Sequence, residues 1–509
     1  MRIPSLLAAA GAIFCSGGLF AQPFLSSPYF NVRNHGAKGD GRADDTAAIQ
    51  HTIDSVTQRG GGIVYVPPGR YNTRPFQLKN GVTFYLEANA TLVASPRIAD
   101  YPVEPKGRFS ESQRAGLITI RNANKVAITG RGVIEGSGLQ FVDRTKVKIL
   151  RDADRKLTRQ GDDFMDPRFG ANDGPWMPLP ERPGNLIRIV DSEDVEITGV
   201  TIRNAPTWTI EIFNSVHINI HAARILASDS QWRVPNDDGI DIRDSRLVHI
   251  SDMDIESGDD CIAVFSGEDI TVTNSTLRSK SAGIRIGYFE GALRRAVFSN
   301  LVIHDSNRGV NVNVRYGNTI ENVLFSNIVI HTRLFDGQWW GKAEPVNVSA
   351  LLSPRGTGMA GFIRDLRFEH ISAESEAGIV VFSEPAGLIR DLFFDDVRVR
   401  IRKGPLQESY GGNFDLRGDT PPEFALFKHD IPAFYARGVT GLTINDVNVQ
   451  WEDGVPEFYT NALYVENSSI VDIQHLKGKS ARNGVHVLRI ENSKEVTTDF
   501  KPEPKPRPN

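Results

Sequence analysis

Two short acidic segments carry side chains that could perform acid–base chemistry: Pro-Asn-Asp-Asp-Gly-Ile-Asp, which begins at Pro235, and Ser-Gly-Asp-Asp-Cys-Ile, which follows about one repeat later. When the segments are aligned, Asp237 of the first matches Asp259 of the second. Asp238 matches Asp260 in the same way, and apolar residues alternate after each acidic pair. On neighbouring parallel strands the matched residues would lie about 4.8 Å apart. Carboxylates crowded in this way repel one another, so the cluster indicates a functional site.

Carboxyl groups that flank a glycosidic bond can hydrolyse it, because one protonates the leaving oxygen while the other activates a water molecule. A third carboxylate nearby raises the pKa of the acid and keeps it protonated. Side chains alternate along a strand, so we expect Asp259 and Asp260 to point in different directions. Asp238 would then lie one rung from Asp260.

The elements that position these residues are predicted from a repeat. Short apolar triplets with a period of two recur, mostly at intervals of roughly 21 to 32 residues, and the spacing is typical of a solenoid. The triplets begin at residues 195, 216, 248, 270, 323, 366, 392, 442 and 471. Their β-branched composition excludes helical solenoids. The sequence therefore predicts an all-β fold, a single-stranded right-handed parallel β-helix, with asparagines at the turns that tolerate left-handed backbone and form ladders.

Several segments stand outside the repeat. Asp44, Asp45 and Thr46 predict the start of a helix that runs to about Val56, with Ala47, Ile49, Ile53 and Val56 on its apolar side. This helix is expected to close the N-terminal end of the solenoid, within a cap at about residues 28–75. Residues from about 136 to 184 are predicted to be a long loop insertion. The β-helix domain spans 22–500, and the proline-rich residues 501–509 form a disordered tail.

The N-terminal segment predicts export. Arg2 and the apolar run from Leu6 to Phe20 resemble a secretory signal peptide over residues 1–21, cleaved after Ala21. We therefore expect a secreted or periplasmic protein that lacks a membrane span after cleavage. Cys261 is then the remaining cysteine, and we interpret it as a small buried residue rather than a nucleophile. The net charge of −4 over 509 residues argues against nucleic acid as a partner.

The ordered motifs resemble those of the polygalacturonases, glycoside hydrolase family 28. The matching stretches are Arg182-Pro183, residues 204–208 (Asn-Ala-Pro-Thr-Trp), residues 236–241 (Asn-Asp-Asp-Gly-Ile-Asp) and residues 258–261 (Gly-Asp-Asp-Cys). Gly36 to Gly41 also look like the cap of pectin-active β-helix proteins. The resemblance covers roughly residues 28–480. It implies inverting hydrolysis, with Asp259 as the general acid and with Asp238 and Asp260 holding the attacking water.

The next two rungs depart from the family pattern. The family has Gly-His-Gly where this chain has residues 281–283 (Ser-Ala-Gly), and Arg-Ile-Lys where it has Asn311-Val-Asn313. In the family these residues support the site and bind the carboxylate of the sugar. Register places Arg285 between Ala263 and Asn311 in one outward column, and Arg308 in the column of Asp260. We predict that Arg285, Arg308, Asn311 and Asn313 contact substrate, whereas neutralisation of nearby aspartates is the alternative for the two arginines.

A second candidate constellation is rich in aromatic residues. Trp339 and Trp340 lie in a glycine-flanked loop, and paired tryptophans of this kind suit stacking on a sugar. We predict that both bind substrate together with Lys342 and Glu344, although packing in the core competes with this interpretation. The remaining predicted contacts are Trp232, just before the first acidic segment, and Tyr288.

The sequence leaves three functions open. The first is a hydrolase acting on polygalacturonate or rhamnogalacturonan, exo-acting if the insertion closes the cleft. The second is a pectate-lyase-like enzyme, with the carboxylates on calcium and Arg285 or Arg308 as base. The third is a carbohydrate-binding β-helix whose aspartates form a polar ladder. For the hydrolase we expect no cofactor, no metal, a polysaccharide or oligosaccharide partner and a monomer. Gln160 to Asp163 copy the second acidic motif, and we interpret them as a solvated loop.

Overall fold

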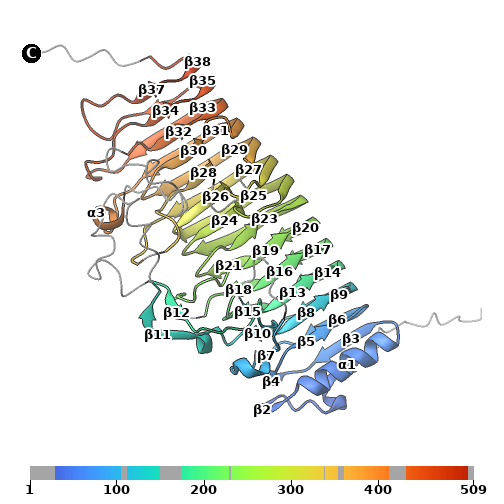
Figure 1. Ribbon diagram of the computed structural model, residues 1–509. Coiled ribbons are helices and arrows are strands. Elements are labelled where there is room, and N and C mark those ends of the chain that lie inside the picture. The colour runs from blue at the N-terminus through green and yellow to red at the C-terminus, as the bar shows by residue number, and fades with distance from the viewer. Residues whose placement is uncertain are drawn as a thin grey trace, which may run out of the picture.

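Parallel β-strands stack into one elongated solenoid (Figure 1). The computed structural model describes residues 29–104, 112–148, 174–228, 231–337, 339–352, 360–411 and 431–501. Within these ranges 23 strands form a larger sheet, sheet A, and 13 form a smaller one, sheet B. The strands of both sheets pair in parallel, while β11 (Val142–Val147) and β12 (Trp176–Pro178) form a separate antiparallel pair. The predicted parallel β-helix is confirmed.

The strands of sheet B, in chain order, are β5 (Phe76–Leu78), β8 (Ile118–Arg121), β13 (Ile187–Val190), β16 (Ile210–Phe213), β19 (Ile240–Arg243), β22 (Ile262–Val264), β24 (Ala282–Gly287), β26 (Arg308–Val314), β28 (Val346–Leu351), β30 (Ile379–Glu384), β32 (Phe434–Arg437), β34 (Leu463–Glu466) and β37 (Leu488–Glu491).

The strands of sheet A are β1 (Tyr29–Asn31), β2 (Asp40–Asp44), β3 (Gly62–Val66), β4 (Gly69–Thr73), β6 (Val82–Leu86), β7 (Ala90–Ala94), β9 (Asn124–Gly130), β10 (Val133–Glu135), β14 (Glu193–Thr198), β15 (Thr201–Arg203), β17 (Val216–His221), β18 (Arg224–Leu226), β20 (Ser245–Ser251), β21 (Asp254–Ser257), β23 (Gly267–Ser279), β25 (Ala292–Ser306), β27 (Thr319–Thr332), β29 (Phe362–Ser375), β31 (Ile389–Ile401), β33 (Val439–Trp451), β35 (Ser469–Gln474), β36 (Lys477–Gly478) and β38 (Lys494–Thr498).

Apolar side chains fill the interior in columns that follow the predicted register. Ile240 pairs with Ile262, and Ile262 with Ile284, all fully buried. Phe325 stacks on Phe368 with ring centroids 4.9 Å apart, close to the spacing of paired strands. The repeat therefore sets the register, because a slip of one residue would expose each of these columns.

The corners of the coils use residues that tolerate left-handed backbone. Asn274, Asn300 and Asn327 all have φ between 51° and 55° and occupy equivalent positions in successive coils. The side-chain amide of Asn300 donates to the side-chain oxygen of Asn274 at 3.3 Å, and Asn327 donates to Asn300 at 3.4 Å. The predicted asparagine ladder is confirmed, although it lies on the outer surface, away from the acidic cluster.

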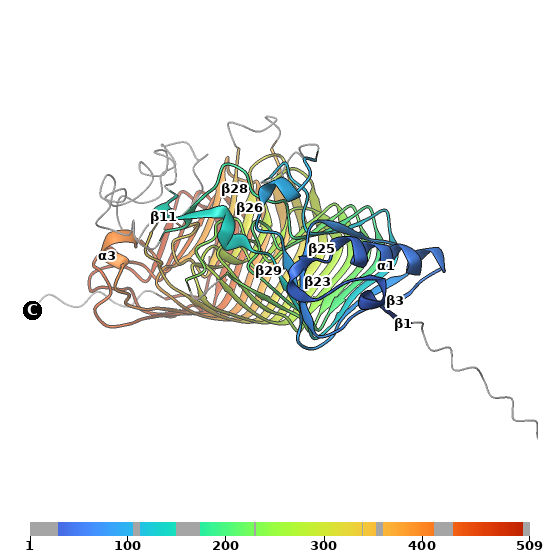
Figure 2. The ribbon, with the colours of Figure 1, turned by 90° about the horizontal axis from the view of Figure 1, so that it is seen from below.

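The helix α1 (Thr46–Gln58) lies across the N-terminal end of the solenoid (Figure 2). Ile49, Ile53 and Val56 are fully buried there, as predicted. Ala47 is exposed, so its placement on the apolar side was wrong; Ala48 packs against the core instead. No side-chain hydrogen bond caps the helix from Asp45, whose carboxylate accepts from the backbone of Lys38 and Gly39.

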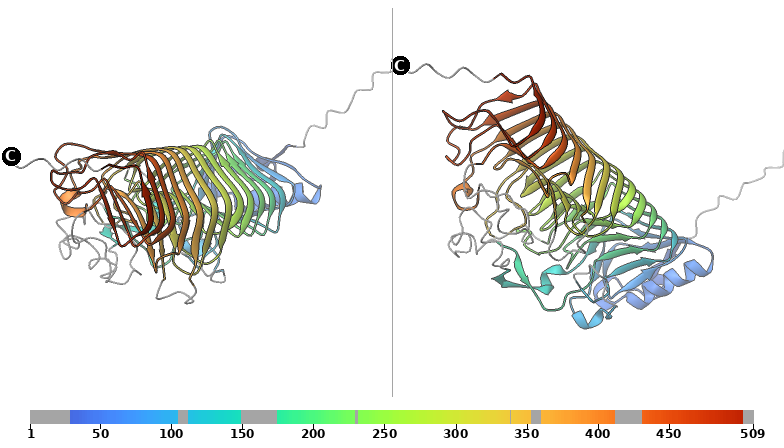
Figure 3. Two further views of the ribbon diagram at one scale, coloured as in Figure 1. Left: turned by 90° about the horizontal axis from the view of Figure 1, so that it is seen from above. Right: turned by 45° about the horizontal axis from the view of Figure 1, so that its top comes forward.

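The remaining helices are short: α3 (Gln407–Tyr410) and the 3₁₀ segments η1 (Val32–His35), η2 (Ile98–Asp100) and η3 (Gly138–Phe141). Both α3 and the β11–β12 pair lie on one flank of the solenoid (Figure 3). In the described part of the chain, no helix has the length and apolar character needed to cross a membrane. The predicted signal peptide, residues 160–163 and nearly all of the predicted tail lie outside the described residues.

Candidate active site

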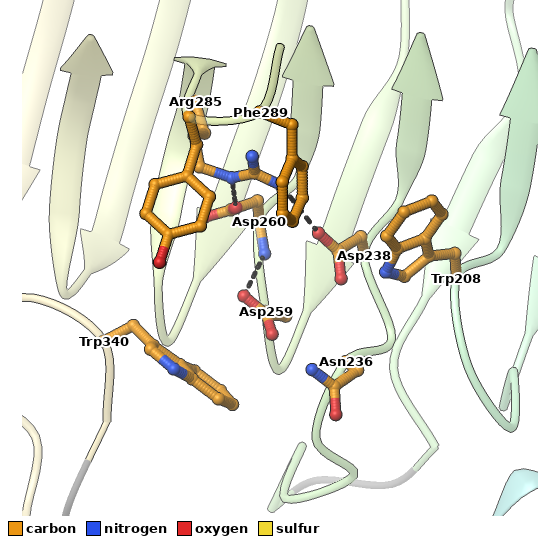
Figure 4. A pocket seen from close by; sticks show the side chains of 9 residues that line it. Trp208, Asn236, Asp238, Asp259, Asp260, Arg285, Phe289 and Trp340 are labelled. Atoms are coloured by element: carbon orange, nitrogen blue, oxygen red, sulfur yellow. Dashed lines mark hydrogen bonds and ion pairs between the residues drawn. The ribbon is translucent and has the colours of Figure 1, made fainter. Parts of the chain in front are cut away.

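A pocket of about 150 Å³ opens on the outer face of sheet B, at the turns that lead into β19 and β22 and beside β24. Figure 4 shows Trp340 and Trp208 on opposite sides of the three aspartates. The described residues that line this pocket are Trp208, Asn236, Asp238, Asp259, Asp260, Arg285, Tyr288, Phe289 and Trp340.

Asp259 and Asp260 both point into the pocket, so the expectation that they point in different directions was wrong. The reason is that they occupy a turn between β21 and β22 rather than a strand, and strict alternation does not apply there. The backbone N–H of Asp260 donates to the carboxylate of Asp259 at 3.0 Å. The hydroxyls of Ser257 and Ser279 donate to the backbone carbonyl of Asp259, which fixes the turn from below.

Arg285 joins two of the three carboxylates. Its Nε donates to Asp260, and its Nη2 lies 3.6 Å from the carboxylate of Asp238. Asp260 also accepts hydrogen bonds from the Ser281 hydroxyl at 2.7 Å and from the backbone N–H of Ala282 at 3.0 Å. Three donors, one of them charged, hold Asp260 as the anion.

The carboxyl groups of Asp238 and Asp241 are less well compensated. Burial, followed by repulsion from Asp259, raises the pKa of Asp238 well above its usual range, and Arg285 opposes this shift. Burial also raises the pKa of Asp241, two rungs before Arg285 in the same column, and its oxygens have no hydrogen-bond partner among the described residues. Asp260, with donors from Arg285, Ser281 and Ala282, is therefore better stabilised as a carboxylate than Asp238 or Asp241.

Asp237 and Cys261 support the turn rather than the pocket. The carboxylate of Asp237 accepts from the backbone N–H of Gly258 at 2.8 Å, which ties the two acidic segments together. Cys261 is fully buried and burial raises the pKa of its thiol to about 12. The thiol stays protonated at neutral pH, which suits the small buried residue that the sequence predicts.

The predicted outward column is present in the strand pairing. Ala263 pairs with Arg285, Arg285 with Asn311, and Asn311 with Asn347. Asn311 is fully buried, and neither atom of its side-chain amide has a hydrogen-bond partner among the described residues. Asn313 accepts from the Ser349 hydroxyl at 2.9 Å. Neither asparagine lines the described pocket, so their contact with substrate stays a prediction.

Arg308 has a different environment from Arg285. Its guanidinium lies 3.2 Å from the carboxylate of Glu344, and the two side chains are 1% and 0% exposed. Glu344 also accepts from the backbone N–H of Lys342 at 2.8 Å. These three residues are outside the described lining of the pocket, and the geometry favours a structural role for them over the predicted contact with substrate.

Breaking the Arg308–Glu344 pair is expected to destabilise the fold. Arg308→Met leaves a buried carboxylate without its counter-ion, and such changes cost about 3–5 kcal/mol. The double variant Arg308→Met with Glu344→Met removes both charges and should recover most of the loss. Urea unfolding measures the effect, and Arg364→Met, in an exposed pair with Glu321, serves as the control with little change. A raised KM in Arg308→Met at unchanged stability would instead support the predicted contact with substrate.

The two tryptophans of the aromatic loop have different environments, one in the pocket wall and one in the core. Trp340 lines the pocket and is half-buried, as expected for a stacking residue. Trp339 and Trp232 are buried in a cluster with Phe335, so packing accounts for both. The Nζ atom of Lys148, at the end of β11, lies 5.2 Å from the centroid of the Trp340 ring. Part of the predicted insertion therefore reaches the pocket wall.

Tyr288 lines the pocket as predicted, but three other lining residues were not predicted as site residues. Phe289 follows Tyr288 directly, and its ring stacks on Phe265, which stacks on Trp208. Asn236 precedes the first aspartate pair and accepts from the buried guanidinium of Arg182. Asn236 and Trp208 belong to the matched motifs, so the signal was present. The motifs do not say which of their side chains face the pocket, because tertiary packing decides this.

The carboxylates also meet the geometric requirement for a cation site. One oxygen each from Asp238, Asp259 and Asp260 lies within 4.8 Å of the others, and oxygen ligands suit calcium. The guanidinium of Arg285 already pairs with two of these groups, so a cation would compete with it. Glu193, Asp194 and His217 form another such group on the exposed surface.

Comparison with known proteins agrees with this site. The family model described as "Glycosyl hydrolases family 28" matches residues 64–334, more than half of the chain. The chain belongs to this family. This membership agrees with the resemblance that the motifs indicate. A probable polygalacturonase of Vitis vinifera is 33% identical over 245 residues, which are 46% of this chain and 43% of that protein.

A second relative, the exo-poly-alpha-D-galacturonosidase of Dickeya chrysanthemi, is 26% identical over 47% of this chain and 42% of its own length. The chain thus spans less than half the length of these two relatives. Among solved structures, the family 28 exopolygalacturonase of Yersinia enterocolitica has a TM-score of 0.60 at 18% identity, covering 94% of this chain and 79% of that one. The hyperthermoactive exopolygalacturonase of Thermotoga maritima has a TM-score of 0.55 at 18% identity, covering 89% and 92%. Both show the shared fold.

Proposed function

We propose that this protein hydrolyses glycosidic bonds in a pectin-like polysaccharide at the pocket on sheet B. The observation that carries the proposal is the convergence of Asp238, Asp259 and Asp260 within 4.8 Å, with Asp260 held as the anion. A carboxylate held by a charged donor, beside carboxyl groups whose pKa is raised by burial and mutual repulsion, can provide the base and the acid that hydrolysis requires.

In this mechanism Asp259 protonates the leaving oxygen, as the family resemblance implies. Asp238 and Asp260 hold the attacking water, because oxygens within 4.8 Å can share one water at ordinary hydrogen-bond lengths. The separation is shorter than the roughly 6.5–9.5 Å between carboxyl groups that is usual for inversion. The inverting outcome is therefore taken from the resemblance, and the anomeric form of the first product is its test.

The calcium-dependent lyase is the second candidate, because the same three carboxylates could hold a cation. Purified protein is to be incubated with polygalacturonate, esterified pectin and rhamnogalacturonan oligosaccharides, with and without EDTA. Hydrolysis predicts products with inverted anomeric configuration by NMR, without unsaturated ends, whose yield survives EDTA. Ultraviolet-absorbing unsaturated products that EDTA abolishes would establish the lyase instead, and retained configuration would make one aspartate a nucleophile.

We further propose that a neutral sugar occupies the pocket. Its described lining includes three carboxyl groups and one guanidinium, which is paired with two of them, while the remaining charge-free walls are largely aromatic. A free uronate there would meet like charge, whereas a neutral or esterified sugar would stack without that penalty. Rhamnogalacturonan or esterified pectin suits this environment better than polygalacturonate.

Neutral substrates are expected to be cleaved faster. Galacturonate oligosaccharides whose carboxyl groups have been reduced to alcohols should show a kcat/KM at least about tenfold above that of the free acids, which corresponds to about 1.4 kcal/mol. The two sets share length and linkage, so charge is the difference between them. A preference for the free acids would contradict the neutral sugar and leave hydrolysis itself standing.

An exo mode and export complete the proposal. The β11–β12 pair packs Val142 and Trp176 against Val234, beside the first acidic segment, and Lys148 lies over Trp340. A wall at this position would close one end of the cleft and favour release of short products. The N-terminal segment supports a secreted or periplasmic location.

A further inference from the structure

Lys280 lies in the turn between β23 and β24. It is 7% exposed, and its Nζ donates to the backbone carbonyl of Gln231 at 2.7 Å. The same Nζ lies 4.6 Å from the ring centroid of Trp339, 5.3 Å from that of Trp232 and 5.7 Å from that of Phe335. The guanidinium carbons of Arg278 and Arg333 lie 3.8 Å from the ring centroids of Trp232 and Phe335, so Lys280 shares these two rings, and Trp339 is the ring nearest to its ammonium group. Cation–π attraction is strong where the cation is desolvated.

The backbone around Lys280 holds the floor of the pocket. Ser279, the preceding residue, donates its hydroxyl to the backbone carbonyl of Asp259. Ser281, the following residue, donates its hydroxyl to the carboxylate of Asp260. Lys280 is therefore fixed between the two contacts that orient the catalytic turn.

The side chain of Lys280 reaches the opposite wall. Trp339, one member of its aromatic cage, precedes Trp340, and the two rings lie 6.1 Å apart. The side-chain amide of Asn307 adds a second link, because it donates both to the carbonyl of Lys280 and to that of Gly341, each at 3.2 Å. Floor and wall come from segments about sixty residues apart in sequence, and Lys280 contacts both.

We propose that Lys280 is a positioning residue that holds the Trp339–Trp340 segment against the floor, so that Trp340 faces the three aspartates. The ammonium group acts through the cage of Trp232, Phe335 and Trp339, and the distance between Trp340 and the carboxyl groups depends on it. This role goes beyond the proposed reaction, since Lys280 is not among the residues that line the described pocket.

Lys280→Met keeps an unbranched side chain, one atom shorter, and removes its charge. On a size-fractionated pectin digest its KM is expected to rise about fivefold to thirtyfold, the range of a desolvated cation–π contact, while kcat changes less than about twofold. Lys280→Arg should retain a KM close to that of the parent protein. Lys494→Met, exposed on β38, is the control without effect.

A double-variant cycle with Trp340→Ala tests the route of the effect. If Lys280 acts through Trp340, Lys280→Met in the Trp340→Ala background adds little to KM. The proposal would be overturned if the fold changes in KM of the two single variants multiplied in the double variant, or if KM were unchanged in Lys280→Met.

A readout without substrate separates this inference from the proposed function. Acrylamide quenching of Trp340, taken as the difference between each protein and its Trp340→Phe partner, should increase in Lys280→Met and stay unchanged in Lys280→Arg. Should Lys280→Met not fold, Trp339→Leu against Trp339→Phe makes the same comparison from the other side of the cage. Equal quenching in either pair would overturn the proposal whether or not the protein cleaves pectin.

Discussion

Asp259→Asn is expected to lower kcat on a pectic oligosaccharide by about 10²–10⁴-fold, the usual contribution of a general acid. Asparagine keeps the shape of the side chain and can still accept the backbone hydrogen bond from Asp260, so the turn should survive. On a nitrophenyl glycoside of the released sugar the loss should be far smaller, because that leaving group departs without a proton.

Asp238→Asn and Asp260→Asn provide the matched comparison. Both remove a group that holds water, so their activity should fall on the oligosaccharide and on the nitrophenyl glycoside alike. Asp252→Asn, at an exposed corner with a φ of 56° that asparagine tolerates, is the control with full activity. Recovery on the activated substrate by Asp238→Asn rather than by Asp259→Asn would move the role of acid to Asp238, whose raised pKa makes it the rival.

Arg285→Met is expected to shift the acid limb of the kcat/KM profile to higher pH. The guanidinium lowers the pKa of Asp238, so its removal raises that pKa, and the carboxylate needed to activate water forms only at higher pH. Activity lost at neutral pH should therefore return in part as the pH rises. The profile is measured on the best oligosaccharide from the substrate panel.

The same change should also destabilise the fold, by about 3–5 kcal/mol at neutral pH, because buried carboxylates lose their counter-ion. The loss should shrink as the pH falls toward the ordinary aspartate pKa, where protonated carboxyl groups no longer need the cation. Arg437→Met, which breaks pairs with Glu466 and Glu384 farther along sheet B, should lower stability without moving the pH profile. An acid limb that stays in place in Arg285→Met would show that Arg285 serves the substrate rather than the aspartates.

The fold and the floor of the site could be predicted from the sequence because both depend on a local repeat. The alternation that aligns Ile240 with Ile262 also aligns Asp238 with Asp260 and places Arg285 in its column. A strand pattern cannot describe turns, however. Asp259 and Asp260 both face the pocket because hydrogen bonds fix their turn. The alternation expected of a strand would have placed them on opposite faces.

The sequence by itself therefore determined the β-helix, the family and the stack of aspartates. The tertiary structure decided the environment of the residues around the aspartates. Arg285 and Arg308 lie one rung apart, yet Arg285 joins the aspartates while Arg308 is buried against Glu344, which lies 36 residues farther along the chain. Trp339 is buried in the core and Trp340 lines the pocket, again because of how the surrounding loop packs. Register repeats with each coil, but the loops that cover a given rung lie outside the repeat, and their packing decides which charges and rings reach the site.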